Sequence, residues 1–189
     1  MTPGRKLQMR KEVWAFFFSV VLLGSFVSVS CGGEESGLKW GFSFGAGQPQ
    51  KSKESLNHWA FFPRMDVPVI KNWEIEIEGN ASYYDIAKTK NLYVLGLNTN
   101  ILFKPFRWEG GDFFLLGGAG LGYDNNGDGE VRDIGDSHVA GVLQGGLGIL
   151  YRLGRSLWLR GEYRFHHISD PFDKDGGINT HNVLLGVSF

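Results

Sequence analysis

The chain has 189 residues, enough for one domain, and its 19 basic and 20 acidic residues nearly balance. This balance lacks the basic excess that nucleic-acid-binding proteins carry, so no nucleic-acid partner is expected. The chain has one cysteine, Cys31, which excludes a disulfide framework and a cysteine-based metal site.

The first thirty residues have the pattern of a secretory signal peptide. A basic segment, residues 5–11, precedes an apolar run, residues 13–29, and small residues follow at Ser28 and Ser30. We predict a signal peptide over residues 1–30 and one domain over residues 31–189. A retained membrane anchor and lipidation of Cys31 stay open as alternatives.

The rest of the chain is rich in glycine and aromatic residues and has no apolar run long enough for a transmembrane helix. Its apolar residues recur at every second position, which is the period of a β-strand. The alternation predicts eight strands, at residues 38–45, 57–67, 73–84, 92–103, 113–123, 139–153, 156–169 and 180–189.

The lengths of the predicted connections alternate along the chain. Longer polar segments follow the first, third, fifth and seventh strands, and shorter turns follow the others. Outer-membrane barrels have short periplasmic turns and longer outer loops, so we predict an all-β, eight-stranded antiparallel up-and-down transmembrane β-barrel in the outer membrane. The terminal Phe189 resembles the signal that such barrels present to the barrel assembly machinery, which is an expected partner.

Charged residues form the second face of two predicted strands. In this reading they point into the lumen, where charges need partners, and we expect an internal ion-pair network. Its predicted members are Glu74, Glu76 and Glu78 on the third strand and Arg160, Glu162 and Arg164 on the seventh. The alternative is a soluble, lipocalin-like carrier, in which the apolar rows point inward and these charges face water.

The apolar row of the seventh strand ends in His167 and Ser169. If the chain enters the barrel from the periplasm, this strand ends at the outer surface, and both residues lie on its lipid-facing row. Counting back from the C-terminus puts Asn179 and His181 on the same row of the eighth strand. Polar residues on a lipid-facing wall are costly, which makes this patch a candidate site. The neighbouring His166 faces the lumen and is predicted to be structural.

A serine and a histidine on one strand face are the ingredients of nucleophilic catalysis, with the histidine as the base that activates the serine. The simpler interpretation is an interfacial pair that hydrogen-bonds to water, because His-x-Ser is a weak motif.

A wider pattern surrounds this pair. Residues 164–169 read Arg-Phe-His-His-Ile-Ser, and after a short loop residues 177–182 read Gly-Ile-Asn-Thr-His-Asn. Over residues 156–189 the chain resembles the PagL family of lipid A 3-O-deacylases, which are eight-stranded outer-membrane barrels. The resemblance implies lipid A, or lipopolysaccharide, as the substrate and a serine esterase without a cofactor. It implies Ser169 as the nucleophile and His167 as the general base; a homodimer is left open.

The chain departs from the family pattern at two positions. Asp170 stands where the family has an Asn that helps to stabilise the oxyanion, and Asn179 stands near the place of the triad Glu. Asn179 can still orient the histidine, as an Asn does in papain-like enzymes. His181, and the loop residues Asp173 or Asp175, are further possible supports.

Residues 124–130 match the first half of a calcium-binding loop, but Gly135 stands where a bidentate Glu is needed. A solvated outer loop is therefore expected, and no metal site is predicted. Two functions from different classes remain: a lipid A esterase, and a non-catalytic small barrel that serves envelope integrity or ligand binding.

Overall fold

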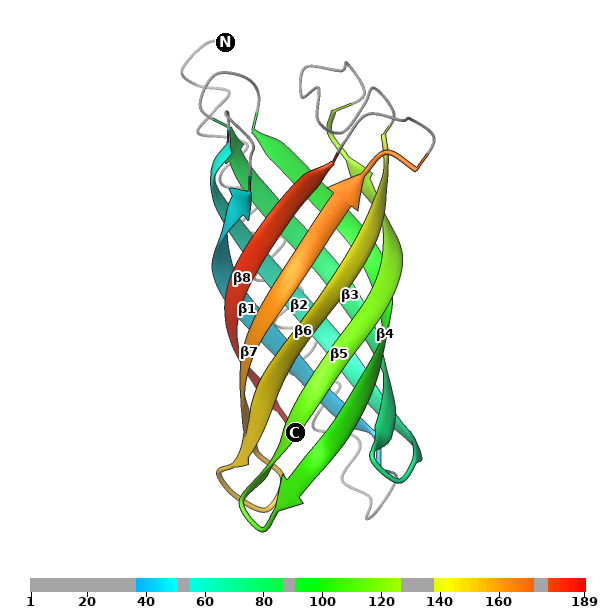
Figure 1. The fold of residues 1–189 in the computed structure, drawn as a ribbon, viewed down its shortest axis with the longest axis vertical. Coiled ribbons are helices and arrows are strands. Elements are labelled where there is room, and N and C mark those ends of the chain that lie inside the picture. Colours follow the sequence, from blue (N-terminus) through cyan, green and yellow to red (C-terminus); the bar gives the residue numbers. More distant parts are fainter. Residues whose placement is uncertain (1–36, 51–54, 87–90, 127–137, 172–176) are drawn as a thin grey trace. The chain divides into compact units, whose positions relative to one another are not determined.

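Eight antiparallel strands close into a barrel in the order of the sequence (Figure 1). They are β1 (Lys39–Gln50), β2 (Ser55–Ile70), β3 (Trp73–Ile86), β4 (Leu92–Trp108), β5 (Gly111–Asp124), β6 (Val139–Arg152), β7 (Trp158–Ser169) and β8 (Ile178–Ser188). The barrel closes where β1 pairs with β8, from Gly41 opposite Ser188 to Gln50 opposite Asn179. The predicted eight-stranded up-and-down barrel is confirmed.

The computed structural model describes residues 37–50, 55–86, 91–126, 138–171 and 177–189. The predicted signal peptide and Cys31 lie outside these ranges, as do the loop residues Asp173 and Asp175 and most of the segment that resembles a calcium loop. The described residues contain no helix long and apolar enough to cross a membrane.

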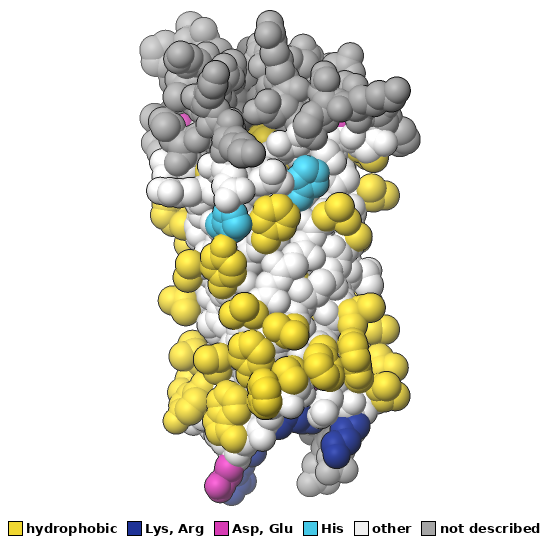
Figure 2. Space-filling view, viewed as in Figure 1, with side chains coloured by type: hydrophobic (Ala, Val, Ile, Leu, Met, Phe, Trp, Pro, Cys, Tyr) yellow, Lys and Arg dark blue, Asp and Glu magenta, His cyan; other side chains and the backbone are white. Residues whose placement is uncertain are grey.

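The apolar rows face outward and the polar rows face the lumen. On β3, Ile75 and Ile77 expose 38% and 41% of their surface, whereas Glu76 and Glu78 between and beyond them expose none. Apolar side chains accordingly spread over the outer surface of the wall (Figure 2). The lipocalin-like alternative requires the opposite alternation and is wrong.

An ion-pair network crosses the lumen between β3 and β7. Arg160 lies 2.5 Å from Glu76, and Arg164 lies 2.7 Å from Glu78. Glu162 contacts both arginines, at 2.7 Å from Arg160. All five side chains are buried, so each charge has a partner where water is scarce. The predicted network between these two strands is confirmed for these residues.

The prediction for Glu74 needs a correction, and one strand was missed. Glu74 pairs with Lys104 of β4, at 2.5 Å, and not with β7, because it lies nearer the end of the barrel. Arg64 and Asp66 of β2 join the network, with Arg64 Nε 3.6 Å from Glu76. These buried side chains fill the lumen, so a substrate-binding site has its room on the outer wall.

The two ends of the barrel differ. The short turns β2–β3, β4–β5 and β6–β7 lie together at the end where the chain terminates, at the bottom of Figure 1. The last residues of β1, β3, β5 and β7 lie at the opposite end. Short turns are periplasmic in outer-membrane barrels, so the opposite end of the wall lies at the outer leaflet.

Candidate functional site on the outer wall

His167 and Ser169 end β7, and Asn179 begins β8, at the outer end of the barrel. His167 is the register partner of Asn179, so the two side chains leave the sheet side by side. All three are half-buried, whereas His166 and Ile168 on the alternate row expose no surface. The three polar residues therefore lie on the lipid-facing side. Histidine side chains reach the surface in the upper half of the barrel in Figure 2.

A hydrogen bond fixes the imidazole of His167. Its Nδ1 lies 2.7 Å from Asn179 Oδ1. An amide oxygen only accepts hydrogen bonds, so Nδ1 donates and carries the proton in the neutral ring. The other nitrogen, Nε2, then has a free lone pair and can take a proton. This is the tautomer that a general base needs.

Ser169 stands beside two glycines. Gly141 of β6 is its register partner, and Gly177 directly precedes the first residue of β8 that pairs with β7. Neither glycine has a side chain to cover the serine hydroxyl. Within the described residues, no hydrogen bond joins this hydroxyl to His167. Their Cα atoms are about 7 Å apart along the strand, so rotation of the two side chains can bring them together.

Gly177 is a residue of the site that sequence reasoning missed. Its φ of +149° lies in the region that only glycine adopts readily. A Cβ added here would lie 2.5 Å from Cε1 of His167 and 3.0 Å from its Nε2. Gly177 therefore provides the space in which the imidazole lies. A glycine directly before the last strand, opposite the His-x-Ser, was the available signal.

The other two predicted residues point elsewhere. Asp170 is 4% exposed and continues the inner row after Ile168, so its carboxylate is not on the lipid-facing side with Ser169. His181 bonds to the Tyr163 hydroxyl, at 2.5 Å from Nδ1, and stacks against the same ring. Asn179, rather than His181, is the side chain that contacts His167.

His166 lies in the lumen as predicted, within reach of the Tyr84 hydroxyl at 3.2 Å and Asn80 at 3.4 Å. It is part of the barrel interior and does not reach the outer wall. Among the residues that the structure describes, no three His, Cys, Asp or Glu side chains gather in a way suited to a metal ion.

The comparisons with known proteins agree with this architecture. The family model "outer membrane protein beta-barrel domain" matches residues 17–189. The structure is similar to the outer membrane enzyme PagL, with a TM-score of 0.60 at 12% identity, covering 78% of this chain and 97% of that one. It is also similar to Neisserial surface protein A (NspA), with a TM-score of 0.54 at 13% identity, covering 81% and 96%.

At these identities the solved structures show the fold alone, and comparison with curated proteins gave no match. The family model, by contrast, spans nearly the whole chain. Together with the closed barrel, the outward apolar rows and the paired charges in the lumen, it shows where the protein resides. The chain belongs to the outer membrane protein β-barrel family and is located in the outer membrane.

Proposed function

We propose that this barrel is an outer-membrane esterase that removes an ester-linked acyl chain from lipid A. The observation that carries the proposal is the hydrogen bond from His167 to Asn179 on the lipid-facing wall. It sets the imidazole in the tautomer of a general base, two residues from a serine, at the end of the wall that lies at the outer leaflet. The likeness of the fold to the enzyme PagL supports the same assignment.

The chemistry is acyl transfer in two steps. Nε2 of His167 takes the proton of Ser169 Oγ as the oxygen attacks the ester carbonyl. The C–O bond to the sugar then breaks, and the imidazolium returns its proton to the departing sugar oxygen. Water, deprotonated by the same imidazole, attacks the carbonyl of the acyl-serine; the acyl C–O bond to Ser169 Oγ breaks, the imidazolium returns the proton to this oxygen, and the fatty acid leaves. Asn179 holds the ring in place throughout but supplies no negative charge to the imidazolium.

The site has a suitable setting for an acyl chain. Leu143, the register partner of His167 on β6, is 58% exposed on the wall. Val183 and Leu185 are about as exposed on β8. An acyl chain whose carbonyl lies at Ser169 can therefore run down the wall over apolar surface. The inward position of Asp170 keeps its carboxylate away from the developing oxyanion, which a negative charge would destabilise.

The alternative is a small barrel of the same fold without catalysis, which serves envelope integrity or ligand binding. It is favoured by the amide of Asn179 at the third position, where a triad has a carboxylate, and by the lack of a hydrogen bond from the serine hydroxyl to the imidazole within the part of the chain that the structure describes. The fold is also similar to that of Neisserial surface protein A.

One experiment separates the two functions. The full chain is expressed in the outer membrane of a host whose lipid A carries all of its acyl chains, and lipid A is examined by mass spectrometry. The esterase predicts loss of one ester-linked acyl chain, and Ser169→Ala restores the intact species. Ser156→Ala, which changes an exposed serine in the turn at the opposite end, is the matched control. Unchanged lipid A with the wild-type protein folded, as judged by heat-modifiable gel migration, would exclude the esterase.

A further inference from the structure

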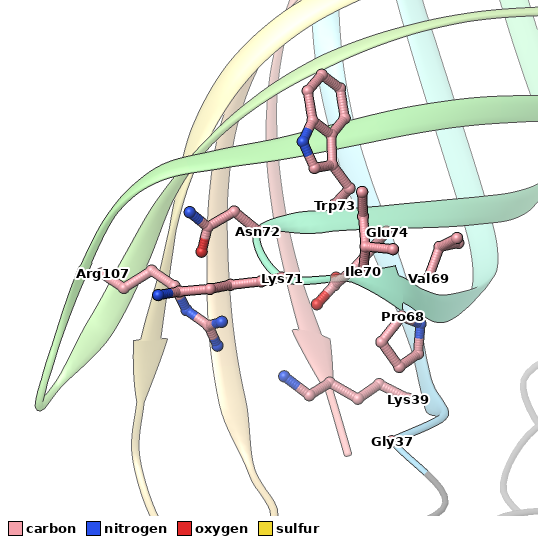
Figure 3. A pocket seen from close by; sticks show the side chains of 10 residues that line it. All are labelled: Gly37, Lys39, Pro68, Val69, Ile70, Lys71, Asn72, Trp73, Glu74 and Arg107. Carbon is pink, nitrogen blue, oxygen red and sulfur yellow. The ribbon is translucent and has the colours of Figure 1, made fainter.

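A hollow of about 370 Å³ lies at the periplasmic end of the barrel, at the opposite end from the candidate esterase site (Figure 3). It is formed by the beginning of β1, the end of β2, the β2–β3 turn, the start of β3 and one arginine of β4. Its lining residues are Gly37, Lys39, Pro68, Val69, Ile70, Lys71, Asn72, Trp73, Glu74 and Arg107.

The backbone explains why the hollow exists. The pairing of β2 with β3 shifts register between Pro68 and Ile70, which bends this end of β2. Asn72 closes the turn with a φ of 67°, a left-handed conformation that asparagine tolerates. Gly37 passes so close to Pro68 that a Cβ on it would lie 2.7 Å from the proline Cγ. The chain enters β1 tightly against β2, beside the bend.

The hollow is positively charged. Lys39, Lys71 and Arg107 extend towards the same space in Figure 3. The carboxylate in the lining, Glu74, is paired with Lys104 at 2.5 Å and offsets part of the charge of Lys39, but the three cations outnumber it. Lys71 is exposed, and within the described ranges no carboxylate pairs with it.

The two other cations are held in place by side chains beside the hollow. The side chain of Arg107 is 50% exposed and forms an ion pair with Asp112, with its Nε 3.2 Å from the carboxylate, so its other guanidinium nitrogens remain for a ligand. The ammonium group of Lys39 lies 4.5 Å from the centre of the Trp158 ring, a cation–π contact that orients it without cancelling its charge. The hollow therefore holds two of its three basic groups in place, and the third, Lys71, extends from the turn beside them.

The side of the hollow that faces the membrane is apolar. Val69, Ile70 and Trp73 expose 55%, 67% and 40% of their surface. Trp73 stacks on Phe103, with the ring centres 4.5 Å apart. Tryptophan in an outer-membrane barrel lies at the level of the lipid headgroups, which places the hollow at that level. The basic groups in the hollow suit a phosphate, and the apolar side chains beside them suit acyl chains.

We propose that this hollow binds the phosphate of an anionic glycerophospholipid in the leaflet that the short turns reach. The lysine and arginine groups bind the phosphate oxygens, and the acyl chains lie along Val69, Ile70 and the wall below. This inference is independent of the proposed esterase, because it uses no residue of that site.

The test uses the full barrel in nanodiscs that contain phosphatidylglycerol and phosphatidylcholine with the same acyl chains. Native mass spectrometry then measures which lipid stays bound after release from the nanodisc. We expect the wild-type protein to retain phosphatidylglycerol preferentially. Lys71→Ala should reduce this preference about fivefold, since a basic residue at a membrane surface contributes about 1 kcal/mol. Lys71→Arg should keep it.

Arg155→Ala is the matched control, because it removes one exposed charge from the β6–β7 turn at the same end of the barrel, outside the hollow. It should leave the preference unchanged. Equal retention of both lipids by the wild-type protein, or equal losses in Lys71→Ala and Arg155→Ala, would overturn the proposal. Titration of the detergent-solubilised barrel with inorganic phosphate distinguishes the source: saturable binding as tight as that of phosphatidylglycerol would refute a lipid site.

Discussion

Asn179→Asp tests the proposed chemistry most directly, because it supplies the carboxylate that the site lacks. The two side chains have nearly the same shape, so the hydrogen bond of 2.7 Å to His167 can persist. During the reaction the ring becomes an imidazolium, and the carboxylate stabilises it where the amide does not. If the protein is an esterase, the substitution should raise its activity.

The size of the effect follows from the strength of the hydrogen bond. A bond to a charged group contributes about 1.5–3 kcal/mol and a neutral one about 0.5–1.5 kcal/mol. The difference of about 1–1.5 kcal/mol corresponds to an increase in rate of about five- to tenfold. Because Asn179 is half-buried, screening favours the lower figure.

The assay is the initial rate of fatty-acid release from lipid A by the purified barrel in detergent. Asn182→Asp is the matched control, since Asn182 on the same strand makes the same kind of bond, from His58 Nδ1 to its Oδ1 at 2.6 Å, but on the lumen side. It should not increase the rate. The reasoning is refuted if folded Asn179→Asp protein is no faster than the wild type, or if both variants accelerate the reaction equally.

Three further variants test the structure at other positions. Gly177→Ala should reduce esterase activity by tenfold or more, because its Cβ would lie 2.5 Å from the imidazole of the proposed base, whereas Gly154→Ala, with open space around it, should have full activity in the same assay. Arg160→Ala should lower the free energy of unfolding in urea by about 3–5 kcal/mol, since it removes the nearest cation of the buried Glu76, at 2.5 Å, and one of the two arginines paired with the buried Glu162, at 2.7 Å, and leaves Glu76 with arginines at 3.6 Å or more; a loss below 1 kcal/mol would contradict the network. Leu147→Arg, on the lipid-facing row of β6, should cost about 2–4 kcal/mol in the same unfolding measurement in lipid vesicles, and little in a short-chain detergent.

The sequence predicted the number, order and facing of the strands because most of them keep the alternation of apolar and polar residues. It predicted their ends less well. The fourth strand was expected to stop at Phe103, before a proline, but β4 continues to Trp108. The register shift between Phe103 and Phe106 accommodates Pro105 at a point where no ladder hydrogen bond is needed.

A proline also explains why two residues that face the lumen were not predicted. Pro63 interrupts the pattern of β2, so the inward positions of Arg64 and Asp66 were not recognised. Pro63 is tolerated because Gly79 on β3 leaves room beside it; a Cβ there would lie 2.9 Å from the proline ring. Close approaches of this kind depend on three-dimensional packing, which periodicity does not contain.

In the candidate site, too, the rows of the residues were predicted from the sequence, whereas most of the side-chain contacts were not. Counting positions from the C-terminus put His167 and Asn179 on one row, and the structure joins them by a hydrogen bond. The separate partner of His181, the hydroxyl of Tyr163, could not be read from the sequence, because it depends on rotamers across two strands. Neither could the role of Gly177, which depends on where the imidazole of His167 lies. The catalytic roles remain predictions.

The ion pairs across the lumen also bear on how the barrel assembles. Arg160 and Arg164 pair with Glu76 and Glu78 across the lumen. The two strands lie on opposite sides of the barrel, and the paired residues are more than eighty positions apart in the chain. No single hairpin contains both partners, so before the barrel closes the two arginines have Glu162 of their own strand, and their pairs with Glu76 and Glu78 form only on closure. A sheet that closed with β8 shifted by one residue would turn β8's side chains to the wrong face. Charge pairing thus makes the final step of assembly cooperative and favours the one closure in which every arginine finds its carboxylate.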